Sequence, residues 1–112
     1  TQQLMIYVFD LDETLCNTPW GRGPDGKKGP QYYESSPKKE RIDKVNSLYD
    51  KGHTIIIETA RGARSGKNWF YFTLDQLKSW GLKFHHVRTG EKFMADFYID
   101  DKAINDKDFF DG

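Results

Sequence analysis

The chain has 112 residues, which is enough for one domain with a modest hydrophobic core. Its 17 basic and 17 acidic residues give a formal net charge of zero, which excludes a global electrostatic attraction to nucleic acid or to an acidic membrane. Cys16 is the single cysteine, so an intrachain disulfide is excluded, and a reducing cytoplasm is the expected location.

The first half of the chain contains a predicted strand, a loop and a helix. Residues 4–9 form a continuous apolar run, which is typical of a parallel strand covered on both faces. Residues 17–37 are rich in glycine and proline, which predicts an exposed, flap-like loop. Ser36-Pro37 resembles a helix start, and Lys51-Gly52 resembles a helix end. The predicted buried face of this helix comprises Ile42, Val45, Leu48 and Tyr49.

The second half alternates in the same way. Residues 53–59 predict a second buried strand, residues 68–81 a second helix, residues 83–89 a weaker strand and residues 96–101 a fourth strand. The buried face expected for the second helix comprises Phe70, Leu74 and Leu77. This order predicts one α/β domain over residues 1–112, a Rossmann-like three-layer sandwich. Its mostly parallel sheet should have the strand order 4-1-2-3.

Acidic residues close the first and the last predicted strands. Asp10 and Asp12 end the first strand, and Asp100 and Asp101 end the fourth. Ligands of an open parallel sheet bind beyond the carboxyl ends of its strands, where these four residues should converge. Like charges so close require a cation, and an all-oxygen set suits Mg²⁺. Zinc fits poorly, because the histidines and the cysteine lack the spacing of zinc ligands.

A magnesium site beside a hydroxyl and a lysine indicates phosphoryl transfer, in which positioning and charge neutralisation carry most of the catalysis. Thr59 ends the second strand, and Lys92 precedes the fourth strand. Asp10 could attack phosphorus directly. Asp12 could protonate the leaving oxygen and later deprotonate the attacking water.

Two arginines lie in the loop after the second strand, on the same edge of the predicted sheet. Arg61 and Arg64 could bind a substrate phosphate or carboxylate with two parallel hydrogen bonds. A solvated loop is the alternative reading. Trp20, Arg22, Tyr32 and Tyr33 in the flap-like loop could likewise touch substrate or pack on the body of the domain.

The order of these residues resembles the four motifs of the haloacid dehalogenase (HAD) superfamily. DLDET at 10–14 resembles its DxDx(T/V) signature, and ETARG at 58–62 resembles its second motif. Lys92 fits the third motif, and FYIDDKA at 97–103 resembles the fourth. The four motifs occur in the family's order and cover nearly the whole chain.

This resemblance implies a role for each motif residue. Asp10 would be the nucleophile, Asp12 the general acid and base, and Thr59 and Lys92 would hold the phosphoryl group. An acid at position 12 favours a phosphatase or a phosphomutase over other members of the superfamily. The magnesium ligands that it implies are Asp10, Asp12 through its carbonyl, Asp100, and Asp101 directly or through water.

The gaps between the motifs are too short for the cap domains of larger family members, so the resemblance implies a capless enzyme with an open site. EKFMADFYIDDKA at 91–103 looks closest to small bacterial and phage phosphatases of surface-polysaccharide biosynthesis. A phosphorylated sugar or similar metabolite is therefore the expected substrate, with no nucleic-acid or membrane partner. A dimer or tetramer could close the site through a neighbouring subunit.

Three other functions remain open from the sequence. A phosphomutase would return the phosphoryl group to its substrate, although it usually needs a cap. A phospho-accepting receiver module uses similar residues, but it places its acid pair on the first strand and its accepting aspartate on a middle strand. A catalytically idle domain would retain the metal site alone.

Overall fold

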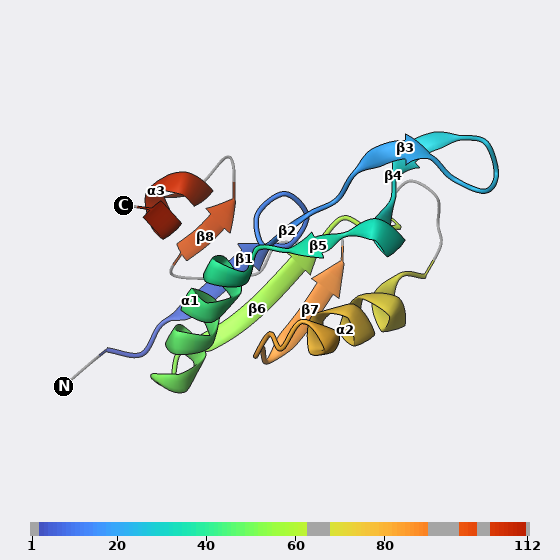
Figure 1. Ribbon diagram of the computed structural model, residues 1–112. Coiled ribbons are helices and arrows are strands. Elements are labelled where there is room, and N and C mark those ends of the chain that lie inside the picture. Colours follow the sequence, from blue (N-terminus) through green and yellow to red (C-terminus); the bar gives the residue numbers. More distant parts are fainter. Residues whose placement is uncertain (1–2, 63–67, 90–96, 101–103, 112) are drawn as a thin grey trace.

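The computed structural model describes residues 3–62, 68–89, 97–100 and 104–111, and of residues 97, 98, 100 and 104–106 it describes the backbone alone (Figure 1). In chain order the elements are β1 (Ile6–Asp10), β2 (Cys16–Asn17), β3 (Trp20–Arg22), β4 (Lys28–Pro30), the 3₁₀ helix η1 (Tyr32–Glu34), β5 (Ser36–Pro37), α1 (Lys39–Asp50), β6 (Thr54–Thr59), α2 (Phe70–Ser79), β7 (His86–Thr89), β8 (Phe97–Asp100), β9 (Ile104–Asn105) and α3 (Asp106–Asp111).

The centre of the molecule is a parallel sheet with the strand order β7-β6-β1-β8-β9. Phe9 of β1 lies opposite Ile57 of β6 on one side and Ile99 of β8 on the other. The strand arrows point the same way in Figure 1, so the carboxyl ends of β1, β6 and β8 meet at one edge. The expectation of an α/β fold with a parallel sheet is confirmed.

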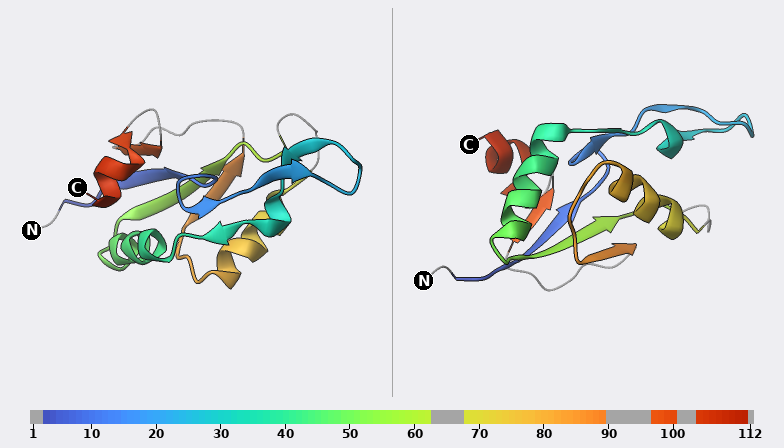
Figure 2. Two further views of the ribbon diagram at one scale, coloured as in Figure 1. Left: turned by 45° about the horizontal axis from the view of Figure 1, so that its top comes forward. Right: turned by 60° about the horizontal axis from the view of Figure 1, so that its bottom comes forward.

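One face of this sheet carries the hydrophobic core. Phe9 and Ile57 are fully buried there together with Ile42 of α1 and Leu77 of α2. Figure 2 shows α1 and α2 on the same side of the sheet. The ring of Phe109 in α3 packs edge-on against Phe9 at a centroid distance of 5.8 Å. The described helices thus cover one face, and the three-layer sandwich stays a prediction.

Helix α1 begins later than predicted, and helix α2 buries a different set of residues from the one predicted. The buried face of α1 is as predicted, with Ile42 and Val45 fully buried. However, the helix begins at Lys39, and Ser36–Pro37 instead forms β5, because proline disfavours helical backbone at the residue before it. The buried residues of α2 are Thr73 and Leu77, so a hydroxyl takes the central place expected for leucine.

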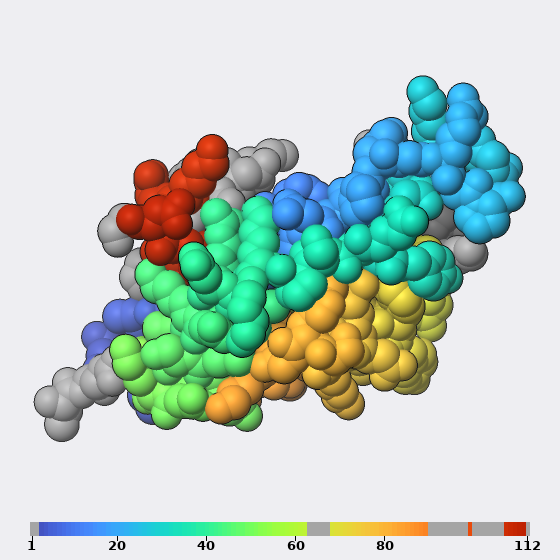
Figure 3. All heavy atoms as spheres, in the orientation of Figure 1, coloured from blue at the N-terminus to red at the C-terminus, as the bar shows by residue number. Residues whose placement is uncertain are grey.

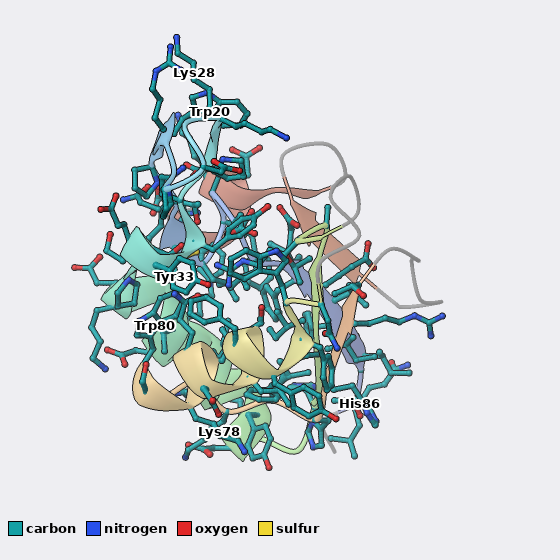
Figure 4. The ribbon with its side chains drawn as sticks, turned by 90° about the vertical axis from the view of Figure 1, so that its right-hand side faces the viewer. Trp20, Lys28, Tyr33, Lys78, Trp80 and His86 are labelled. Carbon is teal, nitrogen blue, oxygen red and sulfur yellow. The ribbon has the colours of Figure 1, made fainter. Side chains whose placement is uncertain are left out.

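The predicted flap-like loop over residues 17–37 contains regular structure. β2 pairs with β5, and β3 pairs with β4, each antiparallel. The β3–β4 ribbon projects beyond the carboxyl edge of the sheet (Figures 1 and 3). Its register places Trp20 opposite Pro30 and Arg22 opposite Lys28, all exposed. Figure 4 labels Trp20 and Lys28, which both lie on this ribbon.

Among the described residues, no helix combines the length and the apolar character needed to cross a membrane.

Candidate active site

Two acidic residues occupy neighbouring positions at the carboxyl edge of the sheet. Asp10 is the last residue of β1, and Asp100 is the last residue of β8. Each follows directly after the paired positions Phe9 and Ile99, so their backbones lie side by side at the strand spacing of roughly 4.8 Å. Asp10 is half-buried. This placement brings the first and fourth motifs together at the level of the backbone.

A tight turn follows β1 and carries Asp12. The amide of Leu11 continues the sheet by donating to the Glu58 carbonyl at 3.1 Å, and the fully buried Leu11 and Leu15 side chains anchor the turn in the core. Glu13 has a φ of 68°, a left-handed conformation that non-glycine residues rarely adopt. Its carboxylate accepts a hydrogen bond from the Thr18 amide at 2.8 Å. Core packing and the hydrogen bond of Glu13 together hold the turn in place.

The carboxylate of Asp12 is the centre of the described site. Its Oδ2 accepts a hydrogen bond from the hydroxyl of Thr59 at 3.1 Å, which joins the ends of β1 and β6. Its Oδ1 accepts from the hydroxyl of Thr18 at 2.7 Å, which joins the site to the base of the flap. The Asp12 side chain remains 24% exposed. It can therefore reach a molecule bound at this edge.

Arg61 forms a buried ion pair with this carboxylate. Its Nη2 lies 2.8 Å from Asp12 Oδ1, and its Nε lies 3.1 Å from Oδ2. The guanidinium is 0% exposed, and it lies over the ring of Tyr32 at 4.6 Å. Its backbone amide also donates to the Thr59 hydroxyl oxygen at 3.2 Å. Thr59, Arg61 and Asp12 thus form one connected cluster.

This geometry contradicts the solvated reading of Arg61, and the reading of Arg61 as a substrate ligand stays a prediction. The side chain is not solvated, because it is 2% exposed as a residue. It is also turned to Asp12, whereas a substrate clamp would present its donors to an incoming phosphate. The sequence reading missed its other partners, which are Ser35, Thr73 and Gln76. The sequence does indicate two of these partners, because Thr73 and Gln76 are polar residues three positions apart and therefore lie on the same face of a helix.

The remaining predicted site residues lie outside the described part of the chain. These are Lys92, Arg64 and Asp101, together with the side chain of Asp100. Within the described residues, no group of three or more histidine, cysteine, aspartate or glutamate side chains is placed to hold a metal ion. The predicted metal set draws on Asp100 and Asp101, so it stays a prediction.

Two further titratable groups surround Asp12. Burial, with the charge of Asp12 adding to its effect, raises the pKa of the Cys16 thiol from 9.0 to about 11. Burial also raises the pKa of the Tyr32 phenol, with Asp12 adding to the effect and Arg61 opposing it. Cys16 is fully buried, as expected for a small packed residue.

His53 and His85 have structural roles. Nδ1 of His53 accepts a hydrogen bond from the Met5 amide at 3.0 Å, and Nδ1 of His85 accepts one from the Ile55 amide at 3.0 Å. The ring of His85 also stacks on Tyr49 at a centroid distance of 4.6 Å. These contacts lie along the strands, away from Asp12.

Comparison with known proteins identifies related folds. No family model matches the chain, and no curated protein matches it. The fold is similar to the crystal structure of a structural-genomics target protein from Vibrio cholerae, with a TM-score of 0.67 and 21% identity over 95% of this chain and 87% of that chain. At this identity the likeness shows the fold alone.

A second solved structure is less similar. It is a Vibrio cholerae protein provisionally named 3-deoxy-D-manno-octulosonate 8-phosphate phosphatase, with a TM-score of 0.46 and 17% identity. The match covers 80% of this chain and 42% of that chain. A likeness of this extent carries no argument about activity.

Proposed function

We propose that the protein is a Mg²⁺-dependent phosphatase of the haloacid dehalogenase type, which hydrolyses a phosphate monoester through a phosphoryl group carried on Asp10. The observation that carries this proposal is the hydrogen bond between Thr59 and Asp12, at 3.1 Å. It joins the first and second motifs at the sheet edge where Asp10 and Asp100 also end their strands. The motif order in the sequence supports the same assignment.

The donor set of this edge fits magnesium. Asp10 and Asp100 are adjacent acidic residues, and a divalent cation would offset the repulsion between their carboxylates. The Asp12 carboxylate is already taken up by Thr18, Thr59 and Arg61. The resemblance to the haloacid dehalogenase motifs implies that Asp12 would bind the metal through its backbone carbonyl, and we keep that assignment. Bound Mg²⁺ would neutralise charge on the phosphate oxygens.

The proposed reaction has two steps. In the first, a carboxylate oxygen of Asp10 bonds to phosphorus while the bond from phosphorus to the ester oxygen breaks, and Asp12 gives that oxygen a proton. In the second, water gives a proton to Asp12 and attacks phosphorus, the Asp10 oxygen leaves, and inorganic phosphate is released. Lys92 would hold the phosphoryl oxygens in both steps, and Thr59 would join it by turning its hydroxyl proton from Asp12 to the bound phosphoryl group.

The substrate class follows from the resemblance, which implies a capless enzyme with an open site. A phosphorylated sugar or a similar metabolite is the proposed substrate, and a dimer or tetramer is the proposed means of closing the site. The exposed β3–β4 ribbon projects beyond this edge (Figure 3). Arg64 and Asp101 keep their proposed roles in substrate and metal binding.

Hydrolysis of p-nitrophenyl phosphate tests the proposal. We expect turnover with Mg²⁺, loss of turnover with a chelator, and a loss of roughly a hundredfold or more in Asp10→Asn. Lys83→Ala is the matched control, because it removes only the exposed ion pair between Lys83 and Asp50, which is the last residue of α1. A rate that is unaffected by chelator or by Asp10→Asn would refute the phosphatase.

The same experiment separates the alternatives. Stable phosphorylation of Asp10 without turnover would indicate a receiver module, and metal binding without phosphorylation would indicate an idle domain. Transfer of the phosphoryl group back to a sugar phosphate would indicate a phosphomutase. A Mg²⁺-supplemented screen of phosphorylated sugars, nucleotides and phosphopeptides then identifies the substrate class.

A further inference from the structure

We propose that Arg61 is a positioning residue that fixes the Asp12 carboxylate for proton transfer and does not bind substrate. The proposal rests on the function proposed above, because it assigns Arg61 a part in that reaction. It reverses the reading that an arginine in this loop grips the phosphate. Three features of the described site carry it.

The first feature is that all five N–H groups of the guanidinium are used within the protein. Nε donates to Asp12, and Nη2 donates to Asp12 Oδ1 at 2.8 Å and to the Ser35 hydroxyl at 3.3 Å. Nη1 donates to Gln76 Oε1 at 2.7 Å and to the Thr73 hydroxyl at 3.3 Å. A guanidinium has five donors and no acceptor. Arg61 therefore has none left for a substrate phosphate.

The second feature is that the guanidinium cannot turn away from Asp12. Its side chain is 0% exposed and lies over the Tyr32 ring at 4.6 Å. Gln76, which accepts from Nη1, is itself fixed because its Nε2 donates to the Tyr32 carbonyl at 2.9 Å. A side chain locked by its own neighbours can hold a reacting group within the small tolerance that catalysis requires.

The third feature is that the network spans the elements on which the site depends. Arg61 follows β6, Gln76 lies in α2, Tyr32 begins η1, and Ser35 precedes β5. Ser35 also lies 2.7 Å from the Thr18 hydroxyl, which in turn donates to Asp12. The orientation of Asp12 is thereby tied to α2 and to both ends of the flap.

This role requires the planar guanidinium of arginine, whose N–H donors point in fixed directions. Two donors meet Asp12 while two others meet α2, an arrangement that a lysine ammonium on a flexible stem does not reproduce. Arg61→Lys should therefore keep a positive charge but lose the geometry. A substrate clamp would behave differently, because a lysine remains a good phosphate ligand.

Steady-state kinetics with p-nitrophenyl phosphate and Mg²⁺ test the assignment. We expect Arg61→Lys and Arg61→Ala to lower kcat about a hundredfold, the effect of misplacing a catalytic group by roughly 1 Å. KM should stay within about threefold of the wild-type value, since no substrate contact is lost. Added guanidinium should restore part of kcat in Arg61→Ala and nothing in Arg61→Lys. Lys83→Ala, the exposed ion-pair control, should leave kcat and KM unchanged.

Gln76→Leu keeps the assignment testable if Arg61→Ala does not fold. It removes a partner of Arg61 and leaves Arg61 and Asp12 in place, so kcat should fall while KM holds. A rise in KM with kcat unchanged in Arg61→Ala, together with near wild-type kinetics in Arg61→Lys, would overturn the proposal and return Arg61 to substrate binding. Unchanged kcat and KM in every Arg61 variant would also overturn it.

A second readout is independent of turnover. The Nε–H proton of Arg61 should exchange slowly with solvent in NMR spectra, in contrast to that of the exposed Arg22, and its chemical shift should move in Asp12→Asn. If the wild-type protein hydrolyses no phosphate ester, the proposed function fails, and this measurement alone decides whether Arg61 fixes Asp12. Exchange as fast as that of Arg22 would overturn the positioning role.

Discussion

The buried thiol of Cys16 should be nearly inert in the native protein. Its pKa is raised to about 11 from 9.0, mainly by burial. At pH 8 the thiolate fraction is therefore about 0.1%, compared with about 10% for an ordinary thiol of this kind, a difference of roughly a hundredfold. The side chain is also 0% exposed, which blocks access to reagents. Both effects slow alkylation.

Alkylation by iodoacetamide at pH 8, followed by mass spectrometry, measures this effect. The native protein should react at least a hundredfold more slowly than the protein unfolded in urea. The residual rate should follow the population of unfolded molecules as urea increases. Native alkylation at the unfolded rate would refute the burial of Cys16.

The same shift predicts how stability depends on pH. The folded state binds the thiol proton more tightly than the unfolded state, so this contribution is fully present below pH 9 and is lost as pH rises toward 11. The total is about 3 kcal/mol, of which about 1 kcal/mol is lost by pH 10. Cys16→Ala is the control, because other titrating groups cancel in the difference. A constant difference between the two proteins from pH 8 to 10 would contradict the shift.

Other substitutions probe the packing. Leu77→Ala should lower the free energy of unfolding by about 2–5 kcal/mol in urea denaturation, because Leu77 is fully buried in the core; a loss under about 1 kcal/mol would contradict this. Gly52→Ala should cost about 1–2 kcal/mol, because Gly52 has a φ of +97° and the added Cβ would lie 3.2 Å from Leu4. Gly29→Ala, where nothing lies within 4 Å, is its control and should cost clearly less.

The central strands and helix α1 can be predicted from the sequence, because the pattern of their apolar residues shows which side chains are buried. β1 and β6 are continuous apolar runs, and the buried face of α1 repeats with the period of a helix. The flap is different. Its ribbons pair residues such as Trp20 and Pro30, which no hydrophobic period marks. Glycine and proline indicate a turn there, but they leave the pairing unspecified.

The residues of the candidate site also differ in whether the sequence alone predicts their positions. Asp12 and Thr59 are found from the sequence because each ends an apolar strand, and strand ends of a parallel sheet share an edge. The role of Arg61 depends on contacts with Ser35 and Gln76, which lie in different elements. A loop arginine reads as solvated or as a ligand, and only the packing of α2 and the flap around it decides its role.

The proposed reaction would explain the buried pair of Arg61 and Asp12, because burying charge seldom adds stability. Removing one partner in Arg61→Met should cost about 2–4 kcal/mol, somewhat less than a fully buried pair because Asp12 is 24% exposed. Replacing both residues, Asp12→Leu with Arg61→Met, should recover most of this loss in urea denaturation while abolishing phosphatase turnover. A double variant as unstable as the single one would mean that the fold itself requires the pair. Recovery of stability would mean that the fold does not require the pair and that the buried arginine is kept at a cost in stability.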